Sequence, residues 1–149
     1  MTDRVFLDTN IVLYLKDARE PTKRHRASDW IRRLLASQSL IVSPQVLNEV
    51  FYVGMRKFRH ISKPELRRLV AVFIPACSAP LDATVVTTAL QLEEAHGFQW
   101  WDSVLIASAL AANCTYLLSE DMQHERVIGG MTIIDPFLTE PADILSASH

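Results

Sequence analysis

The sequence predicts an α/β fold with a mostly parallel central sheet of four to five strands. Four short apolar runs, at residues 5–7, 40–42, 116–118 and 132–134, lack the polar–apolar alternation of half-exposed strands. Such runs are typical of strands buried on both faces. Helical patterns separate them, and strands that alternate with helices form βαβ units whose parallel sheet is covered on both sides. Residues 77–81 could add a weak edge strand, since they contain a proline.

The helical segments carry recognisable end signals. Helices are expected over residues 22–36, from 44 to about 58, over the segment after Ser62, between Asp82 and Gly97, and from 101 to about 113. Ser43 is a preferred N-cap residue, and Ser62 with Glu65 has the spacing of a capping box. Asp82 predicts a further N-cap, and Gly97 predicts the end of that helix.

Length and composition indicate one globular domain. The 149 residues are 49% hydrophobic and 21% charged, which excludes a disordered chain, and no repeat or interdomain linker is visible. A single domain over residues 1–149 is therefore expected, with residues 138–149 as a loosely held C-terminal tail. No signal peptide or membrane-spanning stretch is apparent. Cys77 and Cys114 lack metal-ligand spacing, so free thiols and a cytoplasmic location are expected.

The net charge of −2 conceals an uneven distribution. Residues 16–68 contain 13 of the 15 basic residues and five acids, whereas residues 69–149 contain one arginine and ten acids. The first segment therefore carries +8 and the second −9, and residues 1–15 contribute −1. Such a division suggests a basic face for a polyanion, although the same charges could simply solvate amphipathic helices.

Two acids follow predicted strands. Asp8 comes directly after residues 5–7, and Asp121 lies just past residues 116–118. Ligands of an open parallel sheet bind outside the carboxyl ends of its strands, so both carboxylates are candidates for a functional site. Ordinary N-cap or turn roles are the alternative for each.

Two more acids lie on predicted helices among apolar neighbours. Glu49 shares a helix face with Val46 and Val53, where a lone carboxylate is costly. Asp102 precedes Leu105 and Ile106 by one turn, although an acid in a first turn could simply complement the helix dipole. Four such acids would repel one another without a cation. Oxygen ligands without a His or Cys pattern favour Mg²⁺ or Mn²⁺ over zinc, and these ions suit phosphodiester hydrolysis.

At this point the chain resembles the PIN-domain ribonucleases, and most closely the VapC-type toxins of bacterial toxin–antitoxin pairs. Four stretches carry the resemblance in order: FLDTN, VLNEV, WWDSVLIASAL, and LLSEDMQH followed by MTIIDPF. Together they span nearly the whole chain. One departure is Glu125, where many relatives have glycine after the histidine, and this puts the shape of the local loop in doubt.

The resemblance implies a three-layer α/β/α sandwich and a metal-dependent endoribonuclease. It implies that Mg²⁺ or Mn²⁺ is held by four catalytic acids, Asp8, Glu49, Asp102 and Asp121. Supporting polar groups are expected at Thr9, Asn10 and Ser119. An RNA substrate, a cognate antitoxin protein and a homodimer follow from the same resemblance. Asp135 is interpreted as a strand-end residue and not as a ligand.

Basic residues around the connection between two predicted helices are candidates for binding RNA phosphates. They are Arg56, Lys57, Arg59, Lys63, Arg67 and Arg68. Trp100 and Trp101 could stack on a base, but packing in the core or in an interface is the more common use of such residues.

Two other functions compete with the nuclease. A phospho-receiver domain also has acids at strand ends, but it needs a lysine late in the chain, and the last lysine here is Lys63. A non-catalytic PIN-like module that binds RNA or protein is the second alternative, although it has no need of all four acids.

Overall fold

The computed structural model describes residues 3–145, which form one five-stranded sheet flanked by helices. The strands are β1 (Val5–Leu7), β2 (Leu40–Ile41), β3 (Tyr116–Leu118), β4 (Val127–Ile128) and β5 (Met131–Ile134). Their order across the sheet is β2-β1-β3-β5-β4, and all neighbours are parallel except β4 and β5. The α/β fold and the mostly parallel sheet are therefore confirmed.

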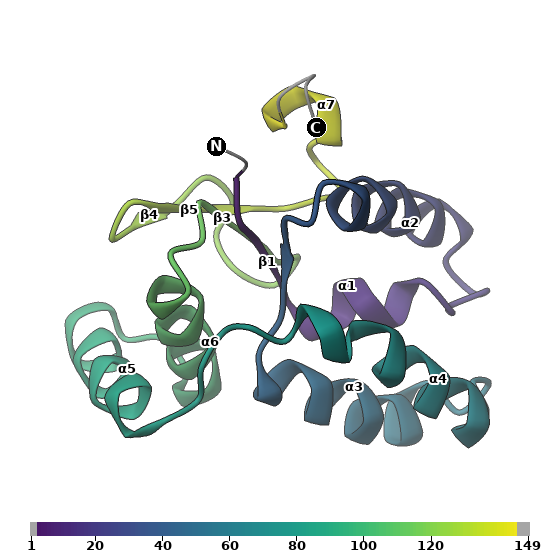
Figure 1. Cartoon of the computed structure of the whole chain (residues 1–149), viewed down its shortest axis with the longest axis horizontal. Coiled ribbons are helices and arrows are strands. Elements are labelled where there is room, and N and C mark those ends of the chain that lie inside the picture. The colour runs from purple at the N-terminus through teal and green to yellow at the C-terminus, as the bar shows by residue number, and fades with distance from the viewer. Residues whose placement is uncertain (1–2, 146–149) are drawn as a thin grey trace.

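Helices cover both sides of this sheet (Figure 1). They are α1 (Thr9–Tyr14), α2 (Pro21–Ala36), α3 (Pro44–Lys57), α4 (Lys63–Phe73), α5 (Ala83–His96), α6 (Trp100–Ala111) and α7 (Pro141–Ile144), with a 3₁₀ turn at Ile74–Ala76. In Figure 1, α5 and α6 lie on one side of β1, and α1 and α2 lie on the other. No helix in the described range is long and apolar enough to cross a membrane.

The predicted end signals are observed. The Ser43 hydroxyl accepts from the Val46 N–H at the start of α3, and Ser62 and Glu65 form the reciprocal capping box of α4. Asp82 caps α5, and Gly97 ends it with a left-handed φ of 70°. These local signals act within one turn, which explains why the sequence alone identifies them.

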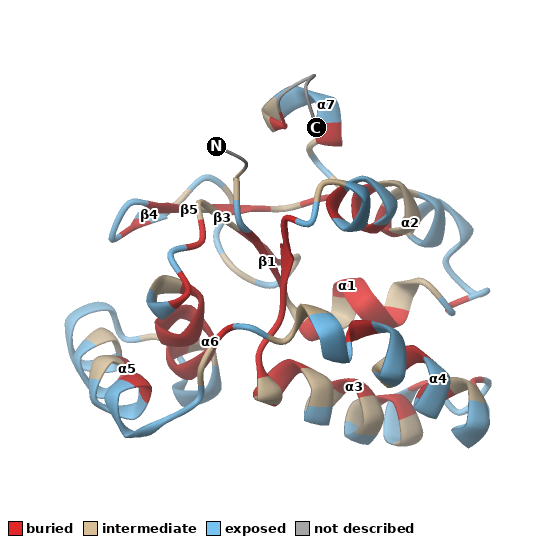
Figure 2. Cartoon of the chain, in the orientation of Figure 1, coloured by how far each residue is buried: buried red, intermediate tan, exposed pale blue. Residues whose placement is uncertain are grey.

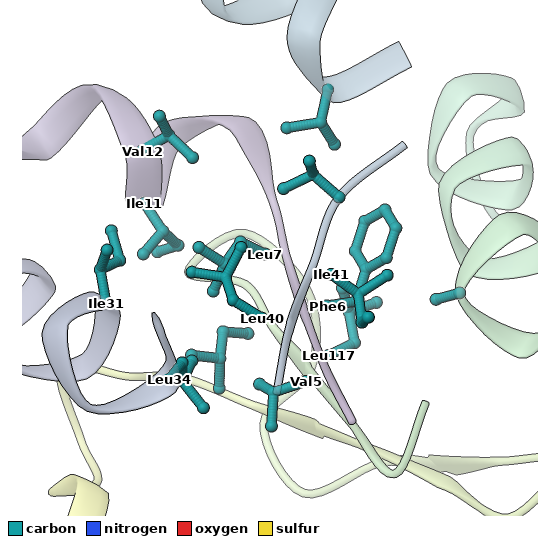
Figure 3. Close-up of a cluster of buried hydrophobic side chains, with 14 of the residues drawn as sticks. Val5, Phe6, Leu7, Ile11, Val12, Ile31, Leu34, Leu40, Ile41 and Leu117 are labelled. Atoms are coloured by element: carbon teal, nitrogen blue, oxygen red, sulfur yellow. The ribbon is translucent and has the colours of Figure 1, made fainter. Parts of the chain in front are cut away.

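The core fills the space between the sheet and its helices. Strand residues are buried throughout β1 and β2, as Figure 2 shows. In the close-up of Figure 3, Ile11 of α1 and Ile31 of α2 lie near Leu7 and Leu40, while Phe6 lies on the opposite side of the strands. Both faces of the central strands are thus apolar, which accounts for the unbroken apolar runs in the sequence.

Parallel pairing aligns the carboxyl ends of β1 and β3. Leu7 lies opposite Leu118 in the ladder, and the Asp8 N–H donates to the Leu118 carbonyl over 3.0 Å. The next residues on the two strands, Asp8 and Ser119, are consequently neighbours. This edge of the sheet holds the candidate site.

α1 and β4 were absent from the sequence prediction, and one predicted strand is much reduced. α1 begins at Thr9, directly after β1, and has only six residues. β4 has two residues and pairs with β5 through a turn at Gly129 and Gly130, both with positive φ. The weak edge strand expected at residues 77–81 is reduced to one isolated parallel bridge between Val42 and Cys77. The proline at position 80 limits that pairing.

Residues 139–145, which belong to the segment expected as a loosely held tail, make defined contacts with α2. The Arg26 guanidinium and the Trp30 indole N–H both donate to the Thr139 carbonyl, at 3.1 and 3.2 Å. α7 then follows, and Leu145 is buried. Long-range hydrogen bonds from α2 produce this order, and the sequence near the tail gives no sign of them. Residues 146–149 lie outside the described range.

Candidate active site

Asp8 directly follows β1 and is the N-cap of α1. Its Oδ1 accepts from the Thr9 N–H at 2.7 Å, and its Oδ2 accepts from the Ser119 hydroxyl at 2.9 Å. The N-cap role considered for Asp8 is therefore present, together with its position at the sheet edge. Ser119 is fully buried, so its hydroxyl is fixed toward the carboxylate.

Burial raises the pKa of Asp8 to about 6. The hydrogen bonds from Ser119 and from the Thr9 N–H act in the opposite direction and lower it. The nearby charges of Glu49 and Asp102 add to the rise, because a second carboxylate disfavours ionisation of the first. Asp8 is thus a partly buried carboxylate that is close to two other acids.

Glu49 reaches this cluster from the second turn of α3. Its Oε2 accepts from the Thr9 hydroxyl at 3.4 Å, and its Oε1 accepts from the Gln45 amide at 2.7 Å. Thr9 and Gln45 are both buried. The inward orientation inferred from the apolar stripe of this helix is therefore what the structure has.

Asp102 lies in the first turn of α6. Burial raises its pKa, and the charges of Asp121 and Glu49 raise it further. The carboxylates of α3, α6 and the loop after β3 therefore lie close enough to influence one another. A position in the first helical turn also allows the dipole interaction considered as the alternative.

Asp121 is the most exposed of the four acids. Its Oδ2 accepts from the Asn10 side-chain amide at 3.0 Å, and its N–H donates to the Ser119 hydroxyl at 3.3 Å. The three supporting groups named from the sequence thus each contact a different acid: Thr9 contacts Glu49, Asn10 contacts Asp121, and Ser119 contacts Asp8.

The donor set suits a hard cation. As the side chains stand in residues 3–145, no three His, Cys, Asp or Glu side chains form a preassembled metal-binding group. Mg²⁺ in proteins commonly uses one or two carboxylates and keeps several waters, so a closed cage of protein ligands is not required. The donors are all carboxylates, and two of them have raised pKa values, which binding of a cation would offset.

A network that the sequence did not reveal supports the loop carrying Asp121. Glu120 accepts a hydrogen bond from the Tyr14 hydroxyl at 2.6 Å and forms an ion pair with Lys23. The Lys23 ammonium also lies over the rings of Tyr14 and Phe137, at 5.2 and 5.3 Å. Tyr14 and Lys23 are nine positions apart, but Lys23 and Glu120 are 97 apart, so only a tertiary contact reveals their relation.

The residue that departs from the family pattern adopts the backbone conformation that glycine favours. Glu125 has φ 67°, and its N–H donates to the Ile133 carbonyl at 2.7 Å. The loop therefore keeps a left-handed turn at this position without a glycine. Nearby, the Asp135 carboxylate accepts from the Phe137 N–H, which is an ordinary turn contact.

Two of the six candidate phosphate-binding residues, Arg67 and Arg68, line different grooves. Arg56 lies over the Tyr52 ring, with its guanidinium carbon 5.2 Å from the ring centroid. Arg67 lines a groove between α3 and α4, whereas Arg68 lines a separate groove between α2 and α4. Lys57, together with Arg59 and Lys63, is exposed around the connection between α3 and α4.

Solved structures of toxin–antitoxin proteins share this fold. A toxin–antitoxin complex from Klebsiella pneumoniae matches with TM-score 0.63 and 17% identity, over 89% of this chain and 97% of that chain. VapBC2 from Rickettsia felis, bound to a DNA fragment from its promoter, matches with TM-score 0.60 and 18% identity, over 87% and 96%. VapC20 from Mycobacterium tuberculosis, a toxin that cleaves the sarcin–ricin loop, matches with TM-score 0.57 and 18% identity, over 78% and 89%.

No curated protein matches the sequence. The family model for the PIN domain matches residues 5–129, a range that includes all four candidate acids. That match covers most of the chain, and the solved structures independently support the same fold. The chain belongs to the PIN domain family.

Proposed function

We propose that the protein is a Mg²⁺- or Mn²⁺-dependent endoribonuclease and the toxin of a type II toxin–antitoxin pair. The observation that carries the proposal is the gathering of four carboxylates from four different segments at one edge of the sheet. Asp8 and Asp102 have raised pKa values, and neighbouring acids contribute to both. A protein has no structural need to collect repelling charges in this way, whereas a metal-dependent hydrolase has.

In this proposal Asp8, Glu49, Asp102 and Asp121 hold the cation, which supplies activation of water and stabilisation of charge on the phosphodiester oxygens. The neutral groups around the cluster orient the acids. Ser119 and the Thr9 N–H hold both oxygens of Asp8, so its carboxylate has one fixed direction.

Glu49 and Asp121 are restrained in the same manner by neutral donors. Gln45 and Thr9 contact the two oxygens of Glu49, and Asn10 contacts Asp121. None of these donors neutralises an acid, so the full negative charge remains available to a cation.

The biological assignment is supported by the family and by the fold. The structures that the chain resembles include a toxin–antitoxin complex, a toxin–antitoxin pair on promoter DNA and a toxin that cleaves the sarcin–ricin loop. We therefore propose an RNA substrate, a cognate antitoxin protein, a homodimer and a cytoplasmic location for this chain as well. The basic residues from Arg56 to Arg68 are proposed to contact RNA phosphates.

Cleavage of RNA by the purified chain tests the proposal. Single-stranded and stem-loop RNA should be cut with Mg²⁺ or Mn²⁺ and left intact when EDTA is in excess. Asp8→Asn, Glu49→Gln and Asp102→Asn should each lower the rate on the order of 100-fold or more. Asp29→Asn is the matched control, because Asp29 pairs with Arg32 and Arg33 on α2 and is not part of the acid cluster.

Two results would contradict this function. Equal cleavage in excess EDTA would exclude the metal mechanism. RNA binding without cleavage under any metal condition would favour the non-catalytic PIN-like module.

A further inference from the structure

A groove opens directly beside Glu49, between α3 and the start of α6. Its volume is about 490 Å³, within the range of roughly 300–1,000 Å³ that small-molecule sites occupy. The residues that form it are Gln45, Asn48, Glu49, Tyr52, Val53, Leu81 and Trp101. One acid of the proposed catalytic cluster is therefore also part of the groove wall.

The walls of this groove are aromatic and exposed. Trp101 is 62% exposed, Tyr52 is 55% exposed, and Leu81 is 39% exposed. Large apolar side chains grouped around one depression mark a binding surface more often than isolated exposed ones do. Trp100, the neighbour of Trp101 in the sequence, does not line the groove and is 36% exposed.

Polar groups are placed among these aromatic faces. The Asn48 amide nitrogen donates to the Pro44 carbonyl at 2.9 Å, which leaves its oxygen as an acceptor on the groove side of α3. Gln45 is buried, and its Oε1 has no hydrogen-bond partner among the described residues. Apolar faces combined with a few amide groups are typical of sites for flat heterocyclic ligands.

The same glutamine joins the groove to the acid cluster. Gln45 Nε2 donates to Glu49 Oε1 at 2.7 Å and to the Trp101 carbonyl at 3.1 Å. The Trp101 backbone and the Glu49 carboxylate are therefore linked through a single side chain.

We propose that this groove receives one unpaired nucleobase of the RNA, from the nucleotide next to the phosphate at the acid cluster. The inference rests on the proposed nuclease function and names the part of the substrate that the chain recognises. Unpaired bases of RNA are bound by stacking on aromatic side chains and by hydrogen bonds to their edges. Trp101 and Tyr52 supply the faces, and Asn48 supplies an acceptor for a base N–H.

Charge at the rim of the groove favours a nucleotide over a protein side chain. The Arg56 guanidinium lies over the ring of the groove residue Tyr52, 5.2 Å from the centroid, and donates to its hydroxyl at 2.5 Å. A cation thus stands next to a stacking face, where the phosphate of the bound nucleotide or of its neighbour can be contacted.

Binding measured without cleavage tests this site. Wild-type protein in EDTA is titrated with 5′-labelled hexanucleotides of A, U, C or G and with an abasic hexamer of the same ribose-phosphate backbone, by fluorescence anisotropy. We expect at least one base-bearing hexamer to bind about tenfold tighter than the abasic one. Trp101→Ala should remove that difference, and Trp101→Phe should retain part of it.

Two further variants provide the controls. Trp100→Ala changes the same residue type outside the groove and should bind all hexamers within about twofold of wild type. Trp101→Leu keeps an apolar side chain but lacks an aromatic face, so it should behave like Trp101→Ala. Because Trp101 is largely exposed, these substitutions should leave the melting temperature nearly unchanged.

The outcomes separate this inference from the proposed function. Equal affinity of wild type for base-bearing and abasic hexamers would overturn it. Full base preference in Trp101→Leu would also overturn it, because the base would then be recognised without an aromatic face at position 101. Loss of base preference in Trp101→Ala would support the nucleobase site even if no RNA were cleaved. Metal-dependent cleavage that is indifferent to Trp101 would refute the nucleobase site and leave the nuclease intact.

Discussion

Ser119 donates its hydroxyl hydrogen to Oδ2 of Asp8 over 2.9 Å and thereby joins the carboxyl ends of β3 and β1. This hydroxyl is fully buried, and it lowers the pKa of a carboxyl group that burial otherwise raises to about 6. Ser119 therefore favours the charged form of Asp8. A cation at this edge needs that charge, so Ser119 acts on the proposed chemistry through Asp8.

Replacing Ser119 with alanine should weaken both the fold and the charge on Asp8. Hydrogen bonds to charged groups contribute about 1.5–3 kcal/mol, so Ser119→Ala should lower the free energy of unfolding by about that amount at pH 7. The pKa of Asp8 should rise above its value in the wild type, because a contact that lowers it is lost. The acidic limb of the pH–rate profile should consequently move to higher pH, which metal-dependent RNA cleavage at several pH values measures.

Ser108→Ala is the matched control for this substitution. Ser108 is equally buried, and its hydroxyl donates to the Pro80 carbonyl, away from the acid cluster. This variant should lose stability without any movement of the pH–rate profile. A profile of Ser119→Ala that coincides with the wild type would show that the contact with Asp8 has only a structural role.

In metal-free protein, Asp8→Asn should increase stability above pH 6. The pKa of Asp8 is about 6 in the folded state and about 3.9 in an unfolded chain, so the folded state binds the proton more tightly. The Asp8 carboxyl therefore makes its full contribution to the free energy of unfolding below about pH 4. This contribution falls as the pH rises and is lost above about pH 6. A shift of two units corresponds to up to about 3 kcal/mol.

Urea denaturation in EDTA between pH 4 and pH 7.5 measures this effect. The difference in unfolding free energy between Asp8→Asn and the wild type should be near zero at pH 4 and should grow toward pH 6. Asp29→Asn should show no such growth, because Asp29 lies outside the acid cluster and is partly exposed. If the difference in unfolding free energy shrank as the pH rose, it would contradict a raised pKa of Asp8 in the folded state.

The sequence predicted those parts of the fold that depend on local signals. The apolar runs of β1, β3 and β5 and the caps at Ser43 and Ser62 act within a few residues, and all are observed. α1 was missed because its six residues follow a strand directly and are too few for a helical period. α7 was missed because contacts from Arg26 and Trp30 hold the chain before it.

The candidate site, too, could be predicted from the sequence only in part. The four acids could be proposed from strand ends and helix faces, since parallel strands bring their carboxyl ends to one edge. Which neutral group holds which acid could not be predicted, because Thr9 and Glu49 are 40 positions apart, and Asn10 and Asp121 are 111 apart. Such pairs depend on the register of the sheet and on where α3 packs.

Glycine at position 125 should stabilise the protein. Glu125 has φ 67°, a left-handed conformation that costs an ordinary residue roughly 1–2 kcal/mol, and glycine adopts it without that cost. Part of the gain is offset by the greater freedom of glycine in the unfolded chain, so Glu125→Gly should add about 0.5–1 kcal/mol. Gln123→Gly, in the same loop without a positive φ, should instead destabilise. Thermal and urea denaturation of both variants measure the effect, and a loss of stability in Glu125→Gly would contradict the argument.

Neutralising Arg56, Lys57 and Arg59 together should weaken RNA binding and flatten its dependence on salt. All three are exposed at the end of α3, and Arg56 lies beside the Tyr52 ring. Each lost phosphate contact should reduce the slope of log K against log salt by about 0.7 for single-stranded RNA. Turnover at saturating RNA should change much less, because the four acids are unaltered.

The control is a triple variant of Arg24, Arg32 and Arg33, which changes the net charge equally but alters α2, on a different part of the molecule (Figure 1). If Arg56, Lys57 and Arg59 contact RNA phosphates directly, this control should keep nearly the wild-type slope of log K against log salt. The control leaves those phosphate contacts, and the counterions that they displace, unchanged. An equal loss of slope in both variants would indicate long-range attraction only. If the Arg56 variant binds RNA normally but is no longer inhibited by its antitoxin, these residues contact an acidic stretch of the inhibitor, and their proposed role in RNA binding is wrong.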